Sequence, residues 1–466
     1  MPEMTTTTTT NHYDDIVLGS GQAGGPLSSA LARAGRRTAL IEREHVGGTC
    51  VNVGCTPTKT MVASARVAYL AKRGADYGVN TGSITIDMSK VRQRKRDIVE
   101  SFRSGSERQV ASTPGLDLVR GEARFVGLKT LVVGDDDDHQ LTADRIFINT
   151  GARPGRPPLS GLDSVPTLDS TSIMELEVVP EHLLVLGGGY VGLEFAQMFR
   201  RFGSQVTLVQ RGPRLLARED ADVADAVADI LRQDGLTILL ETDAARVEPG
   251  EGGKIRLVVR SAAGEQAIVG SHLLVAVGRT PNTDRLNLGA TGLEVDKHGF
   301  LPANDRLETQ VPGIYALGDV KGGPAFTHIS FDDYRIAKTN LIEGGNVSIA
   351  DRPVPYTVYI DPQLGRIGIS EEQARASGRD VKVANMPMSR VARALEVDET
   401  RGFLKVVVDA GTHEILGAAI LGIEGGELMS MLEIAMFGKL PYTVLRDAIF
   451  AHPTLAESFN NLFAEL

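Results

Sequence analysis

The chain of 466 residues is long enough for about two to four domains, and its 42% hydrophobic residues and 51 glycines are typical of a soluble α/β protein with many tight turns. The net charge of −10 argues against nucleic acid as a partner. No run of eighteen apolar residues exists, so no membrane span is expected. The N-terminal MPEMTTTTTTNHYDD lacks the charged and apolar regions of a signal peptide, and we expect a cytoplasmic protein with a disordered tail over residues 1–12.

A glycine-rich turn follows the first apolar run, DIVLGS at Asp15–Ser20, and leads into a predicted helix at Pro26–Ala34. The turn reads G-x-G-x-x-G, with Gly19, Gly21 and Gly24. These glycines allow a tight turn and the close approach of a pyrophosphate to the helix N-terminus. The next strand, Thr38–Ile41, ends in Glu42, an acid at the spacing that binds a ribose hydroxyl. The pattern predicts a dinucleotide site, and a plain βα turn is the alternative.

Cys50 and Cys55 are the only two cysteines, and both lie in GGTCVNVGCTPTK at Gly47–Lys59. They could be two small buried hydrophobes, half of a zinc site, or a redox pair. No second ligand pair supports zinc, so no metal site is expected. Five positions of ideal helix span about 7.5 Å, and a disulfide tolerates at most about 7 Å between α-carbons. A redox pair therefore requires a break in the helix, which would then continue through Met61–Ala71.

This segment closely resembles the redox-active signature of the flavin-dependent pyridine nucleotide-disulfide oxidoreductases, a family that includes dihydrolipoamide dehydrogenase, glutathione reductase, mycothione reductase and mercuric reductase. The resemblance extends from about Tyr13 to the end of the chain. It implies FAD at the first site, a redox disulfide between Cys50 and Cys55, and a flavin stacked near Cys55. It also places Lys59 near the flavin, paired with a glutamate. A thiolate at a helix N-terminus has a lowered pKa, which suits Cys55.

The next stretch contains a long polar helix and several strands. Residues 85–112 form the predicted helix, and its basic stretch Arg92–Arg96 is interpreted as a solvated face in preference to a nucleic-acid patch. Leu116–Val133 predicts hairpin strands that turn at Asp135–Asp138. The strand Arg145–Gly151 enters a glycine turn and matches the family's linker out of the first FAD segment. The FAD contacts implied by the resemblance in these segments are Thr49, Thr150 and Gly151.

A second dinucleotide site is predicted where the pattern repeats. The strand Leu183–Leu186 precedes a second glycine motif and a helix, Leu193–Phe202. The motif glycines are Gly187, Gly189 and Gly192. The position equivalent to Glu42 is occupied by Gln210, and Arg211 follows, with Arg214 and Arg218 nearby. An acid there holds the 2′-hydroxyl of NAD, whereas an arginine accommodates the 2′-phosphate of NADP. We predict NADPH, with NADH possible, and ordinary surface arginines are the alternative.

Several later residues are assigned by the resemblance. Glu194 is implied as the partner of Lys59, and Tyr190 as the aromatic that covers the flavin, although a core tyrosine is the alternative. The strand His272–Val277 runs into Gly278, where the chain returns to the FAD domain. Asp319 ends the second FAD motif and is implied to bind ribitol hydroxyls, with Thr309 as a companion residue.

The last zone, from Pro353, has no glycine fingerprint and corresponds to the family's dimerisation domain. His452 precedes a proline and is followed five residues later by Glu457. A lone histidine is more often structural, but this arrangement matches the family's acid–base pair. A carboxylate orients such an imidazole and raises its pKa, so that it can protonate a leaving thiolate. In relatives this histidine reaches the other subunit's site, which implies a homodimer with shared active sites.

The predicted fold is α/β, with an NAD(P)-binding Rossmann domain inserted in an FAD-binding Rossmann domain and a C-terminal α+β dimerisation domain. The expected bounds are 13–150 and 278–345 for FAD, 151–277 for NAD(P), and 346–466 for dimerisation. The implied activity passes electrons from NADPH through FAD and the cysteine pair to a small-molecule or protein disulfide. The alternatives are a mercuric reductase-like metal-ion or quinone reductase and a redox-sensing flavoprotein. The ending FNNLFAEL lacks the cysteine pair of mercuric reductases, which argues against mercury reduction.

Overall fold

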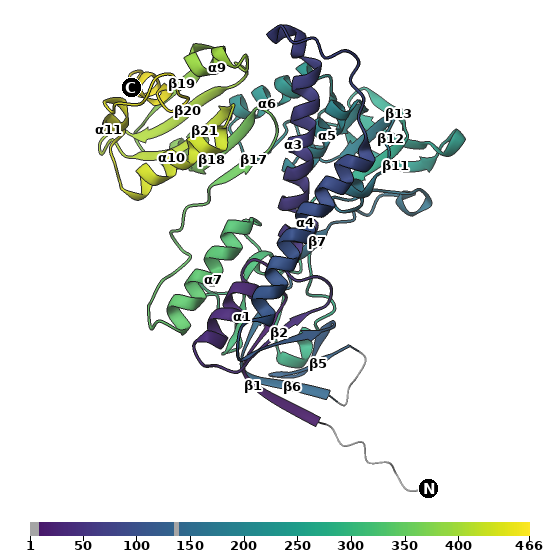
Figure 1. Ribbon diagram of the computed structural model, residues 1–466, viewed down its shortest axis with the longest axis vertical. Helices are drawn as coiled ribbons and strands as arrows, with labels where there is room; N and C mark the ends of the chain where they lie inside the picture. The colour runs from purple at the N-terminus through teal and green to yellow at the C-terminus, as the bar shows by residue number, and fades with distance from the viewer. Residues whose placement is uncertain (1–8, 135–138) are drawn as a thin grey trace. The chain divides into compact units, whose positions relative to one another are not determined.

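A computed structural model describes residues 9–134 and 139–466, and the predicted α/β class is confirmed (Figure 1). The chain forms two compact units, each built from discontinuous segments. The first unit comprises the chain up to Thr60, Lys90–Gly155 and Arg279–Arg352, and the second comprises Met61–Ser89, Arg156–Gly278 and Pro353–Leu466. Within the described ranges, no helix has both the length and the apolar character needed to cross a bilayer.

The first unit is built on a largely parallel sheet. Its strand order is β3 (Leu116–Arg120), β2 (Thr38–Glu42), β1 (Thr9–Leu18), β6 (His139–Ile148), β5 (Thr130–Val133) and β4 (Ala123–Gly127), with β16 (Ile314–Ala316) also paired to β6. All five residues of β2 are buried, as expected of a parallel strand covered on both faces. The helices that begin in this unit are α1 (Gly24–Arg33), α2 (Gly48–Asn52), α3 (Cys55–Lys72) and α7 (Thr327–Leu341).

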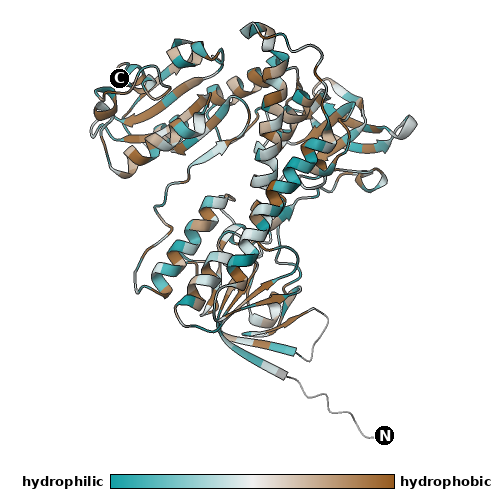
Figure 2. Cartoon of the chain, viewed as in Figure 1, coloured by the Kyte–Doolittle hydropathy of each residue, from teal (hydrophilic) through white to brown (hydrophobic). Residues whose placement is uncertain are grey.

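Three segments differ from their sequence-based expectation. Residues 9–12 were expected in the tail, but they form the start of β1 and pair with β6. The rest of the expected tail, residues 1–8, and the expected turn at Asp135–Asp138 lie outside the described residues. Residues 61–89, expected in the FAD domain, cluster with the second unit. In the polar helix α4 (Met88–Ala111), mainly hydrophilic in Figure 2, the basic stretch is not a fully solvated face, because Lys95 is only 3% exposed.

The second unit contains a second parallel sheet. Its order is β10 (Thr237–Leu239), β9 (Gln205–Val209), β8 (His182–Leu186) and β14 (His272–Val275), and it is accompanied by helices α5 (Tyr190–Phe202) and α6 (Ala221–Gln233). A separate antiparallel sheet, β11 (Asp243–Pro249), β12 (Ile255–Ser261) and β13 (Gly264–Gly270), is inserted before β14. The short strands β7 (Ala152–Pro154) and β15 (Arg279–Pro281) pair with each other in the first unit, where the chain leaves and re-enters it.

The C-terminal zone is an antiparallel five-stranded sheet. Its order is β17 (Tyr356–Val358), β18 (Gln363–Gly368), β21 (Ile415–Gly422), β20 (Phe403–Asp409) and β19 (Val381–Pro387). The accompanying helices are α8 (Glu371–Ala376), α9 (Ala392–Glu396), α10 (Gly425–Phe437), α11 (Tyr442–Arg446) and α12 (Ser458–Phe463). Residues of β20, β21, α10 and α12 share one hydrophobic core, which fixes the C-terminal segment that carries His452 and Glu457.

Candidate active site

The two cysteines lie on different helices. Cys50 is in the one-turn helix α2, Val53 leaves the helical conformation with φ −143° and ψ 15°, and α3 begins at Cys55. The break that a redox pair requires is therefore present. The second helix, α3, runs for 18 residues and includes the predicted Met61–Ala71, so Cys55 is at the N-terminus of a long helix.

The two thiols interact with each other in the reduced state. Cys50 is partly buried and Cys55 is exposed, and a hydrogen bond joins their side chains. The pKa of Cys50 is raised, first by this hydrogen bond, then by burial and by negative charge on Cys55. A thiolate on Cys55 thus disfavours a second thiolate on Cys50. The sulfur of Cys55 also lies 3.2 Å from the hydroxyl of Thr327, which starts α7 and was not singled out in the sequence.

The first glycine turn is closely packed. A β-carbon on Gly24 would lie 2.0 Å from the carbonyl oxygen of Gly19, so any larger residue would force α1 away from the turn. At the end of β2, Glu42 accepts hydrogen bonds from the backbone N–H (3.0 Å) and hydroxyl (2.6 Å) of Ser20. Asn149, which the sequence analysis did not single out, donates its amide N–H to the Gly19 carbonyl at 3.1 Å. The turn, the helix N-terminus and the acid fit the pyrophosphate and ribose of FAD.

A second group of predicted FAD contacts lies in the same unit. The Thr150 hydroxyl donates to the carbonyl of Asn282 at 2.9 Å, and Gly151 has φ +66°. The side chain of Asp319 is 22% exposed, and its pKa is raised by burial, against the lowering effects of Arg279 and Lys321. A carboxylate held at the end of β16 in this way is suited to accept hydrogen bonds from sugar-alcohol hydroxyls. Two further predicted contacts lie in this unit: the Cα of Gly21 packs against Gly48, and Thr49 is exposed in α2. Gly278, with φ +126°, is the last residue of its segment in the second unit.

The second glycine turn repeats the packing of the first. A β-carbon on Gly192 would lie 2.1 Å from the Gly187 carbonyl oxygen, whereas one on Gly189 would meet nothing within 4 Å. The side-chain oxygen of Gln210 accepts the N–H of Gly188 at 2.9 Å. Arg211 is exposed, as are Arg214 and Arg218. The turn therefore has an uncharged amide where the first turn has a carboxylate, with exposed arginines beside it.

The residues assigned to the flavin's surroundings come from different units. Tyr190 starts α5, and its ring centroid lies 6.1 Å from that of Tyr356. Glu194, 5% exposed on the same helix, accepts the backbone N–H of Tyr359 at 2.9 Å. Lys59 belongs to the first unit and Glu194 to the second, so their pairing stays a prediction.

His452 and Glu457 are in contact, as the resemblance to the family's acid–base pair implies. The imidazole Nδ1 lies 2.9 and 3.1 Å from the two carboxylate oxygens. The side chain of His452 is 72% exposed, while that of Glu457 is 19% exposed. The carboxylate can therefore fix the orientation of the ring through Nδ1, and the other ring nitrogen remains accessible. Among the described residues, no three His, Cys, Asp or Glu side chains form a cluster suited to a metal ion.

Comparison with known proteins matches this chain to one family. The family model "Pyridine nucleotide-disulphide oxidoreductase" matches residues 13–333, and the model of its dimerisation domain matches 354–463. The chain is 39% identical over 459 residues to the probable pyridine nucleotide-disulfide oxidoreductase RclA of Escherichia coli, covering 97% of this chain and 99% of that protein. It is 36% identical over 448 residues to a mercuric reductase of Bacillus cereus, covering 96% and 70%.

Solved structures agree with the sequence matches. A Cu(II) complex of the HOCl-induced flavoprotein disulfide reductase RclA from Escherichia coli superposes with a TM-score of 0.88 at 39% identity, covering 98% of this chain and all of that one. The chain therefore belongs to the pyridine nucleotide-disulphide oxidoreductases, which are FAD-dependent NAD(P)H:disulfide oxidoreductases.

Proposed function

We propose that this enzyme uses NADPH to reduce a small-molecule or protein disulfide, with Cys50 and Cys55 as the redox-active pair. The observation that carries the proposal is the broken helix that brings the two thiols into hydrogen-bond contact at the N-terminus of α3. The chemistry that bound FAD supplies is the transfer of two electrons from the nicotinamide to the Cys50–Cys55 disulfide. The glycine turn, Glu42 and Asp319 are the groups that would hold it.

The substrate step is a pair of thiol–disulfide exchanges. The Cys50 thiolate attacks one sulfur of the substrate disulfide, so that a mixed disulfide forms and the first substrate thiolate leaves. Cys55 then attacks the Cys50 sulfur, which releases the second substrate thiolate and forms the Cys50–Cys55 disulfide. The substrate gains two electrons, and the two cysteines lose them. Because the pKa of Cys50 is raised by its neighbour, this attack requires a base that takes the Cys50 proton.

His452 of the partner subunit is proposed as that base. It takes the Cys50 proton and then gives it to the leaving thiolate, and Glu457 stabilises the imidazolium between the two steps. A homodimer with shared sites is supported by the dimerisation model and by exposed apolar side chains on and just after α10 and α11. These are Met431, Ile434, Phe437, Leu440 and Val444, between 38% and 68% exposed.

The roles of the residues around the flavin and the coenzyme are proposed from the family to which the chain belongs. Lys59 and Glu194 would pair beside the flavin, and Tyr190 would cover it until the nicotinamide enters. Gln210 and Arg211 would favour the 2′-phosphate of NADPH, although NADH stays possible. We also propose a cytoplasmic location, since a reducing compartment keeps a lone thiol pair available for turnover.

The test is reduction of the FAD-loaded protein by two electrons without oxygen. A thiolate on Cys55 beside oxidised flavin should give a long-wavelength absorbance, which Cys55→Ser should abolish and Cys50→Ser should retain. Loss of the band in Cys50→Ser alone would reverse the two roles.

A second experiment, a screen of low-molecular-weight disulfides and dihydrolipoamide as substrates, identifies the substrate class. A protein that turns over none of them would contradict the proposed activity.

A metal-ion reductase is the second candidate. It is supported by the exposed thiol of Cys55 beside Cys50, a soft ligand pair, and by the names of the relatives, which include mercuric reductases and a copper complex. Hg(II) and Cu(II) therefore belong in the same screen. NADPH oxidation that depends on either ion and is lost in Cys50→Ser would favour this candidate.

A redox-sensing role is disfavoured by the His452–Glu457 pair, because a sensor needs no proton donor for a leaving thiol.

A further inference from the structure

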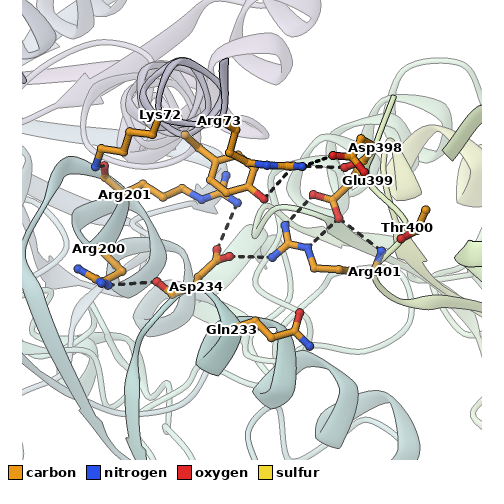
Figure 3. Close-up of a pocket in the computed structure, with 11 residues that line it drawn as sticks. Lys72, Arg73, Arg200, Arg201, Gln233, Asp234, Asp398, Glu399, Thr400 and Arg401 are labelled. Atoms are coloured by element: carbon orange, nitrogen blue, oxygen red, sulfur yellow. Dashed lines mark hydrogen bonds and ion pairs between the residues drawn. The ribbon is translucent and has the colours of Figure 1, made fainter. Parts of the chain in front are cut away.

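A pocket of 530 Å³, lined mainly by charged side chains, lies within the second unit (Figure 3). Its walls are the last turns of α3, α5 and α6 and the segment Asp398–Arg401. The start of α5 carries the second glycine turn, and Arg200 is in its last turn. Thirteen residues of helix span about 20 Å, so the pocket is at the far end of α5 from the coenzyme turn.

Five cationic side chains and three carboxylates line this pocket. The three carboxylates are all engaged by three of the arginines. Arg73 pairs with Asp398, Arg201 lies 3.2 Å from Asp234, and Arg401 lies 2.6 Å from Glu399. Arg201 also pairs with Asp361, and Arg73 with Asp76. Among the described residues, Lys72 and Arg200 are the two cations of the pocket that have no ion pair.

Lys72 and Arg200 are held by backbone carbonyls alone. The Lys72 ammonium donates to the carbonyl of Arg201 at 2.8 Å. Arg200 donates to the carbonyls of Asp234 (3.1 Å) and Ser204 (3.3 Å). Within residues 9–134 and 139–466, no carboxylate lies within ion-pair distance of either group. Carbonyl oxygens occupy some of the donors but do not neutralise the charges, so each side chain keeps N–H groups for another acceptor.

The two cations are close enough to oppose each other. Burial lowers the pKa of Lys72, and the positive charge of Arg200 lowers it further. Both side chains lie on the same side of the pocket in Figure 3. A bound anion would relieve this repulsion and accept the remaining donors. The side chains of Gln233 and Thr400 also line the pocket and make no hydrogen bond within the described part of the chain, so they add uncommitted polar groups.

The chemistry favours a compact oxyanion over a nucleoside. An ammonium beside a guanidinium is a common combination for phosphate groups. The aromatic ring in the pocket, Tyr69, is already contacted by guanidinium groups, with Arg201 at 3.9 Å and Arg73 at 5.3 Å from its centroid. A base that stacked on this ring would have to compete with these guanidinium groups. We propose that Lys72 and Arg200 form a binding site for a small multivalent oxyanion of the phosphate or pyrophosphate type, separate from the glycine turn of the same unit.

The test uses the FAD-loaded full-length protein and sodium pyrophosphate as the probe. Binding is measured by titration calorimetry at constant ionic strength, with saturating NADP⁺ present to occupy the coenzyme site. We expect one saturable site per chain and, since each variant loses a charge-assisted contact, about tenfold or more weaker binding in Lys72→Met and in Arg200→Met. Lys72→Arg, which keeps the charge, should bind more tightly than Lys72→Met.

The matched control is Lys297→Met, which removes one charge from an exposed site in the other unit and should bind as the native protein does. Flavin absorbance and circular dichroism establish that each variant is folded. Absence of saturable binding to the native protein would overturn the proposal, as would native-like binding in Lys72→Met or an equal loss in Lys297→Met.

Discussion

The side-chain oxygen of Gln210 accepts a hydrogen bond from the backbone N–H of Gly188 at 2.9 Å, in the second glycine turn. In the first turn Glu42 accepts the N–H of Ser20 at 3.0 Å, from the same position relative to the glycine motif. The two glycine turns thus make the same contact between a backbone N–H and a side-chain oxygen. The accepting group is a charged carboxylate in the first turn and an uncharged amide in the second. A carboxylate can hold a ribose 2′-hydroxyl but repels a 2′-phosphate, whereas an uncharged amide can hydrogen-bond a hydroxyl without repelling a phosphate.

The first prediction concerns this difference. Gln210→Glu combined with Arg211→Ala should lower kcat/KM for NADPH by at least about tenfold, because it adds a repelling charge and removes a charge-assisted hydrogen bond. The value for NADH should fall less or rise. Steady-state kinetics with both coenzymes measure the ratio, and Arg232→Ala, at an exposed position in the last turn of α6, serves as a control for the loss of an arginine from the same unit. A native protein that prefers NADH would refute the proposed coenzyme selection.

The sequence was most informative where function constrains local spacing. The two glycine motifs predicted the two parallel sheets, and the separation of Cys50 and Cys55 predicted the break between α2 and α3, because one continuous helix would hold the sulfurs too far apart for a disulfide. The resemblance to the family's acid–base pair likewise implied a contact between His452 and Glu457, and the fold brings them within 2.9 Å.

What the sequence did not reveal depends on residues far apart in the chain. Thr327 reaches Cys55 from 272 positions away, and Asn149 reaches the Gly19 carbonyl from 130 positions away. Neither residue belongs to a local motif, so periodicity and spacing carry no signal for it. The unbalanced charges of Lys72 and Arg200 depend in the same way on which carboxylates the fold places beside their neighbours.

The second prediction separates the two half-reactions. His452→Gln should leave reduction of the flavin by NADPH nearly unchanged, since that step needs no proton from this residue. Disulfide turnover should slow by about 10²–10⁴-fold, the usual contribution of a general acid–base group. Stopped-flow absorbance measures the first step and steady-state assays the second. Glu457→Gln should give a smaller loss in turnover alone, and an equal loss in both steps for His452→Gln would remove it from the proposed role.

The third prediction concerns a buried charge in the first unit. Asp333 has no exposed surface; it accepts the N–H of Gly318 at 2.7 Å and lies 2.7 Å from Arg352 and 3.2 Å from Lys321. Removing it would leave two cations without their buried partner. Asp333→Ala should therefore lower the free energy of unfolding by about 3–5 kcal/mol.

The neighbouring Asp332 provides the matched control for this measurement. It contacts the same Arg352 at 3.1 Å, but its side chain is 32% exposed. Asp332→Ala should cost less than about 1 kcal/mol, as is usual for a solvent-accessible ion pair. Urea unfolding of both variants gives the comparison, and similar losses in the two would contradict a dominant role for the buried carboxylate.

The fourth prediction assigns different tasks to two glycines of the second motif. Gly192→Ala should destabilise the protein by about 1–3 kcal/mol, because its β-carbon would lie 2.1 Å from the Gly187 carbonyl oxygen and force α5 off the turn.

The other glycine is Gly189. The β-carbon added by Gly189→Ala would meet no atom within 4 Å, so this substitution should change the free energy of unfolding by no more than about 0.5 kcal/mol. We propose that a coenzyme pyrophosphate approaches the backbone on that open side, so the added methyl group should weaken NADPH binding by about tenfold or more. Urea unfolding measures the first effect, and coenzyme titration of the oxidised protein with NADP⁺ measures the second. If Gly189→Ala lost stability while keeping native affinity, the open face beside Gly189 would not be the coenzyme's path to the helix N-terminus.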